Sequence, residues 1–402
     1  MATYTREMKS DVEIHDESRV YKGYTLYSPM YGNYAWLIDM DGNIVHYWEM
    51  KNPTSNHCIL TPQGTLFWHG RGPGANEELQ SNGTELVEVD WDGNELWRYD
   101  DNLLNHDFAI LENGNILILR YCNIPEDIQK KIKGGIPGTE LDGRIYGISI
   151  HEINRKKEIV WEWYNYEHLD PEKDVECPLD PRMVWGYSNA IAVFPNGDPL
   201  LSIRHLNTIA RIDKKSGEIV WRWGPEYLVG HQHCVTVLEN GNVMLFDNGL
   251  HRKYLRSGDP LEAGTTFEAS RILEVNPKTD KVEWEWVDPR HLIYTNICGS
   301  AQRLPNGNTL ICESKKGIFY EITYDKDIVW KYQSPFLIRR PAFFGWSLSK
   351  IVFQAHRYGE DFEGFKGKEL DPERFEWVIQ EKSKGTLKEE EKIAKRLSMT
   401  GY

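Results

Sequence analysis

The sequence predicts an all-β protein, a six-bladed β-propeller followed by a short helical C-terminal extension. Two short phrases, each repeated along most of the chain, support this prediction. Repeats are considered first because a repeat architecture determines the whole fold. A chain of 402 residues suits such a domain, since all-β folds often exceed ordinary domain length as a single unit.

The first phrase joins a polar turn to a strand that contains tryptophan. Examples are DGNIVHYW at residues 41–48, DGNELWRY at 92–99 and SGEIVWRW at 216–223. The leading tryptophans of the six copies are Trp48, Trp97, Trp161, Trp221, Trp284 and Trp330. Tryptophan at a fixed place in every blade is expected to pack between adjacent sheets, where one ring buries a large area.

The second phrase places a glycine turn between two apolar runs, as in LENGNILIL (111–119) and LPNGNTLIC (304–312). Asn-Gly is a strong hairpin signal because both turn residues must accept a positive φ. Together the two phrases give each repeat four short antiparallel strands, which is one propeller blade. The sixth repeat lacks this turn, and we expect it to borrow a strand from residues 21–38.

The repeats also set the expected domain boundaries. Residues 20–358 are assigned to the propeller, and 359–402 to an extension packed outside it. The stretch 381–395 is rich in Lys and Glu, as is typical of a solvated charged helix. Uneven repeat spacing leaves insertions at 122–145, 164–186 and 250–268. Long loops on one rim of a propeller usually shape its site.

Composition argues against two classes of partner. With 47 basic and 61 acidic residues, the formal net charge is −14, whereas nucleic acids and anionic membranes are bound by basic patches. No apolar run resembles a signal peptide or a membrane span, and the six cysteines form no CxxC pair. We therefore expect a cytoplasmic protein with reduced thiols that binds neither nucleic acid nor membrane. The oligomeric state is left open, with a homodimer as one alternative.

Histidines stand at matching places before the second phrase. His57 lies seven residues before Gly64, and His106 and His233 each lie eight residues before a turn glycine. In a propeller the innermost strand of each blade lines the channel, so matching places in the repeat point to the same spot on the axis. A single such histidine could merely satisfy hydrogen bonds, but the set predicts a histidine-lined cavity.

Three further polar residues extend this set. Asn189 occupies the same place in its own repeat as His106 does in the second. His231 lies two residues before His233 and faces the same way by strand alternation. His356 lies in the irregular sixth repeat. These side chains are expected to join the same cavity.

The middle third of the chain resembles the arylsulfotransferase family. The matching stretches are WGYSNAIAVFPNGDPLLSIRHLNTIARIDKKSGEIVWRWG (185–224) and GHQHCVTVLENGNVMLFDNGLHR (230–252), with weaker similarity over residues 20–358. The resemblance implies a six-bladed propeller that moves a sulfuryl group from an aryl sulfate to a phenolic acceptor without a nucleotide cofactor. It also implies a transiently sulfated histidine, with an arginine and other histidines holding the sulfate oxygens.

Three residues carry over from the family. His233 matches the histidine of the QH piece, Arg252 the arginine after FDNG, and Asn189 the asparagine of the SN piece. Tyr187, by contrast, stands where the family has a histidine.

The fifth repeat departs further, because Asn296, Gly299 and Ser300 occupy the strand where the family's nucleophilic histidine is expected. This departure leaves His233 or His356 as the nucleophile. The candidate catalytic set is His57, His106, His233, His356, Arg252 and Tyr187. The candidate substrate-binding set is Asn189, His231, Asn248 and Arg204. The expected substrate is a small aromatic molecule, and the expected reaction needs no cofactor or metal.

A second interpretation uses the histidines as metal ligands. Several neutral imidazoles in one polar cavity suit a divalent ion. In that alternative one ion is held by His57, His106, His233 and His356. The ion would polarise a substrate oxygen for elimination, hydration or hydroxyl transfer on a hydroxylated aromatic ring. A third alternative, a propeller that only binds protein partners, is opposed by the inward histidines.

Overall fold

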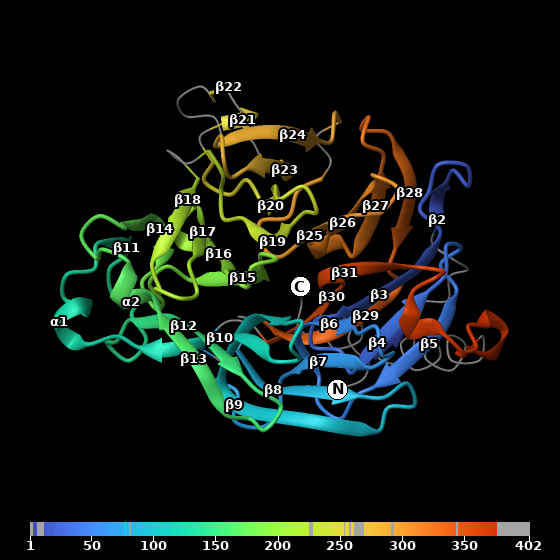
Figure 1. Cartoon of the computed structure of the whole chain (residues 1–402), viewed down its shortest axis with the longest axis horizontal. Helices are drawn as coiled ribbons and strands as arrows, with labels where there is room; N and C mark the ends of the chain where they lie inside the picture. The colour runs from blue at the N-terminus through green and yellow to red at the C-terminus, as the bar shows by residue number, and fades with distance from the viewer. Residues whose placement is uncertain are drawn as a thin grey trace, which may run out of the picture. The chain divides into compact units, whose positions relative to one another are not determined.

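The computed structural model divides the chain into two compact units. Unit 1 comprises Met1–Gly72, Leu86–Arg98 and Gln302–Tyr402, and unit 2 comprises Pro73–Glu85 and Tyr99–Ala301. The structure describes residues 3–5, 12–76, 78–79, 82–224, 228–252, 254–256, 259–260, 269–290, 293–342 and 345–375. Each unit is built from antiparallel sheets in a propeller-like arrangement, and α-helix is limited to the short α1 (Glu126–Gln129) and α2 (Asn165–His168) in this part of the chain (Figure 1).

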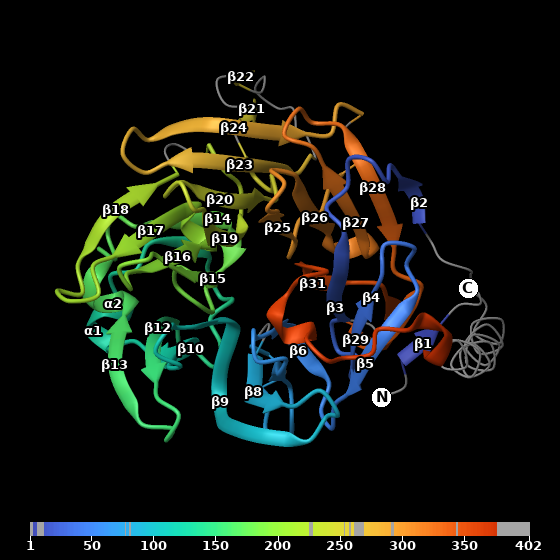
Figure 2. The same ribbon diagram turned by 45° about the vertical axis from the view of Figure 1, so that its right-hand side comes forward.

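Unit 2 contains two four-stranded sheets that each follow the chain in order. The first is β15 (Ser188–Val193), β16 (Pro199–Ile203), β17 (Thr208–Ile212) and β18 (Ile219–Trp223). The second is β19 (His233–Val237), β20 (Val243–Asp247), β23 (Arg271–Asn276) and β24 (Lys281–Val287) (Figure 2). The turn glycines Gly197 and Gly241 have φ of +90° and +82°. These hairpins confirm the turns predicted from the second phrase.

Unit 1 joins the beginning of the chain to its end. One sheet has the order β31 (Val352–Gly359), β3 (Gly23–Pro29), β4 (Tyr34–Ile38) and β5 (Ile44–Glu49). Leu26 on β3 is paired with His356 on β31, which confirms that the sixth repeat borrows an N-terminal strand. The other sheet has the order β2 (Val12–His15), β28 (Ile328–Gln333), β27 (Ile318–Ile322), β26 (Thr309–Glu313) and β25 (Ser300–Arg303).

The prediction of six separate blades is wrong for the second and third repeats. Their strands form one seven-stranded sheet: β13 (Ile159–Tyr164), β12 (Tyr146–Ile153), β10 (Ile116–Asn123), β9 (Glu95–Ile110), β8 (Asn82–Val89), β7 (Leu66–Gly70) and β6 (Thr54–Leu60). The cause is β9, which runs for 16 residues without a break and serves both repeats. The described residues thus form four separate blade-like sheets of four or five strands, not six.

Four of the six leading tryptophans, Trp48, Trp97, Trp284 and Trp330, are buried as predicted. In the third and fourth repeats the leading Trp161 and Trp221 are only half-buried, and the second tryptophan of the phrase, Trp163 or Trp223, is buried in their place. Trp163 donates its ring N–H to the carbonyl of Gly217 at 2.9 Å, in the turn of the following sheet. Trp223 makes the same bond to Asp280 at 3.0 Å, and Trp330 to Met40 at 2.8 Å. Each ring therefore buries a large apolar area while its one donor is satisfied by the next repeat.

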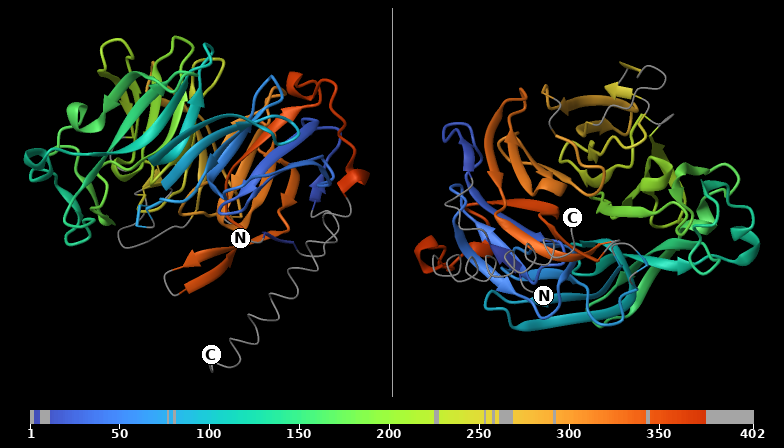
Figure 3. Two further views of the ribbon diagram at one scale, coloured as in Figure 1. Left: turned by 90° about the horizontal axis from the view of Figure 1, so that it is seen from below. Right: turned by 180° about the vertical axis from the view of Figure 1, so that it is seen from behind.

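Smaller elements decorate the two units. In unit 2, β11 (Gly134–Ile136) and β14 (Glu176–Pro181) pair in parallel, and β21 (Tyr254–Arg256) pairs with β22 (Asp259–Pro260). In unit 1, the hairpin of β29 (Phe336–Ala342) and β30 (Gly345–Ser349) pairs with β1 (Thr3–Thr5) and projects from the unit (Figure 3). The remaining turns are the 3₁₀ helices η1 (Arg204–Leu206), η3 (Ser314–Lys316), η4 (Glu363–Phe365) and η5 (Pro372–Phe375).

The start of the expected C-terminal extension packs within unit 1. Phe365 contacts Tyr24 edge to face, with ring centroids 5.2 Å apart. The stretch predicted to be a charged helix, 381–395, lies outside the described residues. The domain boundary at 358 stays a prediction. In the described part of the chain, no helix is both long and apolar enough to cross a membrane.

Candidate functional site

Several predicted site residues of unit 2 lie on strained backbone, within a strand or just before one. His106, Tyr187 and His231 have φ of +41°, +41° and +57°. A non-glycine residue in the left-handed region costs roughly 1–3 kcal/mol and persists only where its surroundings hold it. All three side chains are buried. Holding these three side chains in their observed positions therefore costs the fold some stability.

His106, near the end of β9, is held by its neighbour Asn105. The ring Nδ1 contacts Asn105 Oδ1, and Asn105 Nδ2 donates to the carbonyl of Ser188 at 3.1 Å. The second bond fixes which way the amide points, so its oxygen faces the ring. Since an amide oxygen only accepts, Nδ1 carries the hydrogen and the Nε2 atom of His106 carries the lone pair.

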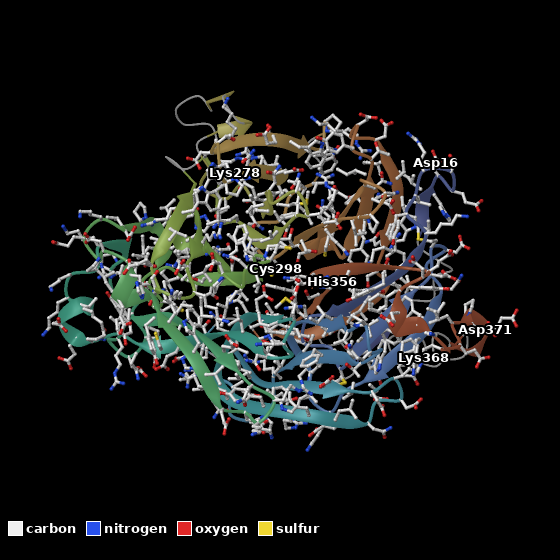
Figure 4. All side chains as sticks on the ribbon, in the orientation of Figure 1. Asp16, Lys278, Cys298, His356, Lys368 and Asp371 are labelled. Atoms are coloured by element: carbon white, nitrogen blue, oxygen red, sulfur yellow. The ribbon has the colours of Figure 1, made fainter. Side chains whose placement is uncertain are left out.

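His233 on β19 is fixed on both sides. Its Nδ1 donates to Asn248 Oδ1 at 2.7 Å, and its Nε2 accepts the backbone N–H of Cys298 at 3.2 Å (Cys298 is labelled in Figure 4). Burial, helped by the charge of Arg204, lowers the pKa of His233 to about 3. The imidazole is therefore neutral near pH 7, with its lone pair directed at a backbone amide.

Tyr187 lies between two imidazoles. Its ring meets His106 edge to face at 5.0 Å and stacks on His205 at 4.7 Å. The Arg204 guanidinium carbon lies 5.8 Å from the centre of the tyrosine ring, close enough for a cation–π attraction. Tyrosine at the position where the family has histidine thus anchors an aromatic and cationic cluster.

Two buried carboxylates face this cluster. Glu176 Oε1 lies 3.3 Å from His205 Nδ1 and accepts the Gly186 N–H at 2.8 Å. Asp180 Oδ2 lies 2.6 Å from His231 Nε2, and its Oδ1 lies 3.8 Å from Arg204. Burial alone raises the pKa of Asp180, but the hydrogen bond with His231 and the nearby charges lower it overall. Asp180 is accordingly a carboxylate near neutral pH.

His231 is tied at both ring nitrogens. Besides Asp180, it contacts the carbonyl of Leu250 through Nδ1 at 3.0 Å. Burial lowers the pKa of His231 although Asp180 opposes this. Its ring also meets that of His251 edge to face at 4.9 Å, and His251 Nδ1 lies 3.3 Å from Cys177 Sγ.

Three other predicted site residues form hydrogen bonds to neighbouring side chains or backbone. Arg252 donates to Asp247 Oδ2 at 2.8 Å and to the carbonyl of Ala269 at 2.9 Å. Asn189 Nδ2 donates to the carbonyl of Gln232 at 2.9 Å. Asn248, besides holding His233, donates to the carbonyls of Thr295 and Cys298 at 2.8 and 2.7 Å. These three side chains brace the loops that carry the histidines.

The remaining two predicted histidines lie together in unit 1. The rings of His57 on β6 and His356 on β31 have centroids 6.1 Å apart, and Phe353 stacks on His57 at 5.9 Å. Figure 4 labels His356. That this pair shares one cavity with His106 and His233 stays a prediction.

The sequence did not point to the acidic part of the cluster. Glu176, Cys177 and Asp180 all lie on β14, in the insertion at 164–186. His205 and His251 were not among the predicted site residues, yet both contact residues of β14. The only available signal was the insertion itself, since these residues belong to no repeated phrase.

A family model described as arylsulfotransferase (ASST) matches residues 55–335, which is more than half of the chain. The chain belongs to the arylsulfotransferase family. Membership suggests arylsulfotransferase-like activity and confirms the resemblance seen in the two middle stretches. No curated protein matches this arylsulfotransferase-family chain significantly.

Solved structures similar to this family member share little sequence with it. A protein of unknown function from Bacteroides caccae is 14% identical over 78% of this chain and 94% of its own, with a TM-score of 0.51. A streptogramin B lyase is 12% identical over 89% and 97%, with a TM-score of 0.46. Virginiamycin B lyase from Staphylococcus aureus is 12% identical over 82% and 86%, with a TM-score of 0.44. At 14% identity, the likeness to the Bacteroides caccae protein concerns the fold alone.

Proposed function

We propose that the protein is an aryl sulfate sulfotransferase that passes the sulfuryl group through His106 to a phenolic acceptor. The bond from His106 Nδ1 to Asn105 Oδ1 is the observation that carries this assignment. It places the nucleophilic lone pair on Nε2, the atom that must attack sulfur. The Nε2 lone pair of His233 accepts the backbone N–H of Cys298, so we assign His233 a positioning role.

The reaction would proceed by two displacements. In the first, Nε2 attacks the sulfur of the aryl sulfate, an N–S bond forms, and the phenolate leaves with the electrons of the broken S–O bond. The ring keeps its Nδ1 proton and becomes cationic, so the hydrogen bond to Asn105 becomes charge-assisted and stronger. In the second, the oxygen of the acceptor phenol attacks sulfur while the N–S bond breaks and returns its electron pair to Nε2. The phenol proton passes to the departed phenolate or to water, and neutral His106 is regenerated.

Neighbouring side chains would stabilise the developing charge and bind the aromatic ring of the substrate. Arg204 pairs only loosely with Asp180, at 3.8 Å, and its charge would stabilise the sulfate oxygens as negative charge builds on them. The Tyr187 ring lies against His106 and offers an aromatic wall for a phenyl ring. No nucleotide or metal takes part in the proposed transfer.

Turnover of 4-nitrophenyl sulfate with phenol as acceptor tests this function. The wild-type protein should release nitrophenol, and quenched turnover should yield a peptide sulfated on His106. His106→Gln should lower kcat/KM by on the order of 10³-fold or more, as loss of a nucleophile does.

His151→Gln is the matched control, because His151 is a buried histidine on β12 of the same unit and should leave kcat/KM unchanged. Thermal unfolding of both variants separates lost chemistry from lost folding. A sulfo group found on another histidine would overturn the role of His106. A well-folded wild-type protein that ignores aryl sulfates would overturn the proposed function.

A further inference from the structure

One cluster of potential ligands in unit 2 takes no part in the proposed transfer. The atoms that Cys177, His231 and His251 can offer to a metal all lie within 4.8 Å of one another. They come from β14 and from the loops before β19 and after β20. Of these residues, only His231 was a candidate site residue in the sequence, and none belongs to the four histidines first considered as ligands.

The spacing suits a small tetrahedral ion. Ligand atoms held at about 2.0–2.3 Å from one zinc ion lie roughly 3.3–3.8 Å apart. Cys177 Sγ and His251 Nδ1 are already 3.3 Å apart, so this edge is nearly formed. All three ligand atoms lie within 4.8 Å of one another, so the third corner closes when His231 exchanges one of its two ring hydrogen bonds for the ion.

The partners of His231 have the pattern of a metal-binding histidine. Such a histidine usually gives its second ring N–H to a carboxylate or a backbone carbonyl, which fixes the ring and its tautomer. His231 has one acceptor of each kind: Asp180 on Nε2 at 2.6 Å and the carbonyl of Leu250 on Nδ1 at 3.0 Å. Whichever nitrogen binds the ion, the other keeps its partner.

The backbone at His251 adds an independent sign. His251 has φ of +59°, in the left-handed region that histidine rarely adopts. Its side chain is half-buried, while Cys177 and His231 are buried. His251 is therefore the most exposed of the three ligands.

We propose that Cys177, His231 and His251 form a binding site for one divalent transition-metal ion, with Zn²⁺ the best match. One thiolate and two imidazoles are ligands that zinc prefers, whereas Mg²⁺ and Ca²⁺ require oxygen ligands. Binding releases the Cys177 thiol proton to solvent. Three protein ligands leave the fourth position to water, as in zinc sites that exchange ligands.

Metal binding is measured independently of sulfuryl transfer. Protein purified without an affinity tag is stripped with chelator and titrated with Zn²⁺ or Co²⁺. We expect about one equivalent of Zn²⁺ per chain, a rise in the unfolding temperature on binding, and a thiolate-to-cobalt charge-transfer band with Co²⁺.

Cys177→Ser should abolish the cobalt band, and both it and His251→Gln should weaken Zn²⁺ binding at least about 10-fold. Cys122→Ser is the matched control, since Cys122 is a buried free thiol on β10 of the same unit, and it should bind Zn²⁺ as the wild type does. The proposal fails if wild-type protein binds no Zn²⁺ tightly, or if the Cys177 and His251 variants retain both the band and the affinity. In either case the cluster would be a hydrogen-bond network only.

Discussion

His151 illustrates how a single buried imidazole couples stability to pH. It lies buried on β12, and neither ring nitrogen has a hydrogen-bond partner among the described residues. Burial, reinforced by the charge of Arg120, lowers the pKa of His151 below its ordinary value. The unfolded chain therefore binds a proton on His151 that the folded chain refuses, so this contribution to stability is present above about pH 6.5 and is lost as the pH falls below it.

The variant His151→Gln should flatten this dependence. Between pH 7 and pH 5, the free energy of unfolding of the wild type should fall more steeply with falling pH than that of the variant. The difference between the two slopes should correspond to at most about one bound proton. Urea unfolding at several pH values measures the difference. Parallel slopes for the two proteins would show that His151 is protonated equally in both states.

Other single residues show what the sequence could reveal of the site. His106 and His233 could be found because the repeat register places both before a glycine turn. The tautomers of these two histidines could not be predicted from the sequence. They are set by side-chain hydrogen bonds with Asn105 and Asn248, which form only in the folded loops. The role of Arg252 was inferred from the family motif and stays a prediction; in the structure Arg252 pairs with Asp247.

Among the elements, two glycines with positive φ, one in a hairpin turn and one directly after a strand, allow a quantitative test. A Cβ added to Gly241, with φ of +82°, would meet no atom within 4 Å. Gly224, with φ of +131°, would place a Cβ 2.1 Å from the backbone oxygen of Asn207. Gly241→Ala carries only the left-handed penalty, about 1–2 kcal/mol. Gly224→Ala must move backbone as well and should cost at least about 3 kcal/mol.

Urea unfolding of the two alanine variants, each compared with the wild type, measures this contrast. Equal losses of stability would mean that the chain around Gly224 relaxes at little cost, and would contradict the steric argument.

Element by element, hairpins and buried tryptophans were predictable because each depends on a few adjacent residues. The exceptions are β9 and β14. Nothing local in residues 95–110 indicates that the last strand of one repeat continues without a break into the first strand of the next. Turn signals mark only where a strand ends. β14 lies in an insertion outside the repeats, and its contacts with His205, His231 and His251 join residues far apart in sequence.

At the scale of the whole chain, the two ends of the described repeats meet in unit 1. Pairing of β3 with β31 was predicted from the missing turn of the sixth repeat. The added strand β2 beside β28 was not, since residues 12–15 belong to no repeated phrase. Edge strands are held by backbone bonds that many sequences can make, so their pairing leaves a weak signal.

A buried ion pair reinforces this junction of the chain ends. Arg357 donates to Glu321 at 3.1 Å, to Thr25 Oγ1 at 2.7 Å and to the carbonyl of Tyr21 at 2.8 Å. Its guanidinium also lies 4.6 Å from the centre of the Trp330 ring. Burial lowers the pKa of Arg357 to about 10, so the group stays charged near neutral pH. One side chain thus links β3, β27 and β31.

Breaking this pair on one side should therefore be costly. Arg357→Leu leaves the Glu321 carboxylate buried without its cation and should lower the free energy of unfolding by about 3–5 kcal/mol. The double variant Arg357→Leu, Glu321→Leu removes both charges and should be more stable than the single variant, because the uncompensated charge is gone. Chemical denaturation of the wild type, both single variants and the double variant completes the cycle. If the double variant loses the sum of the single losses, the two residues stabilise unit 1 separately and the pair does not couple the chain ends.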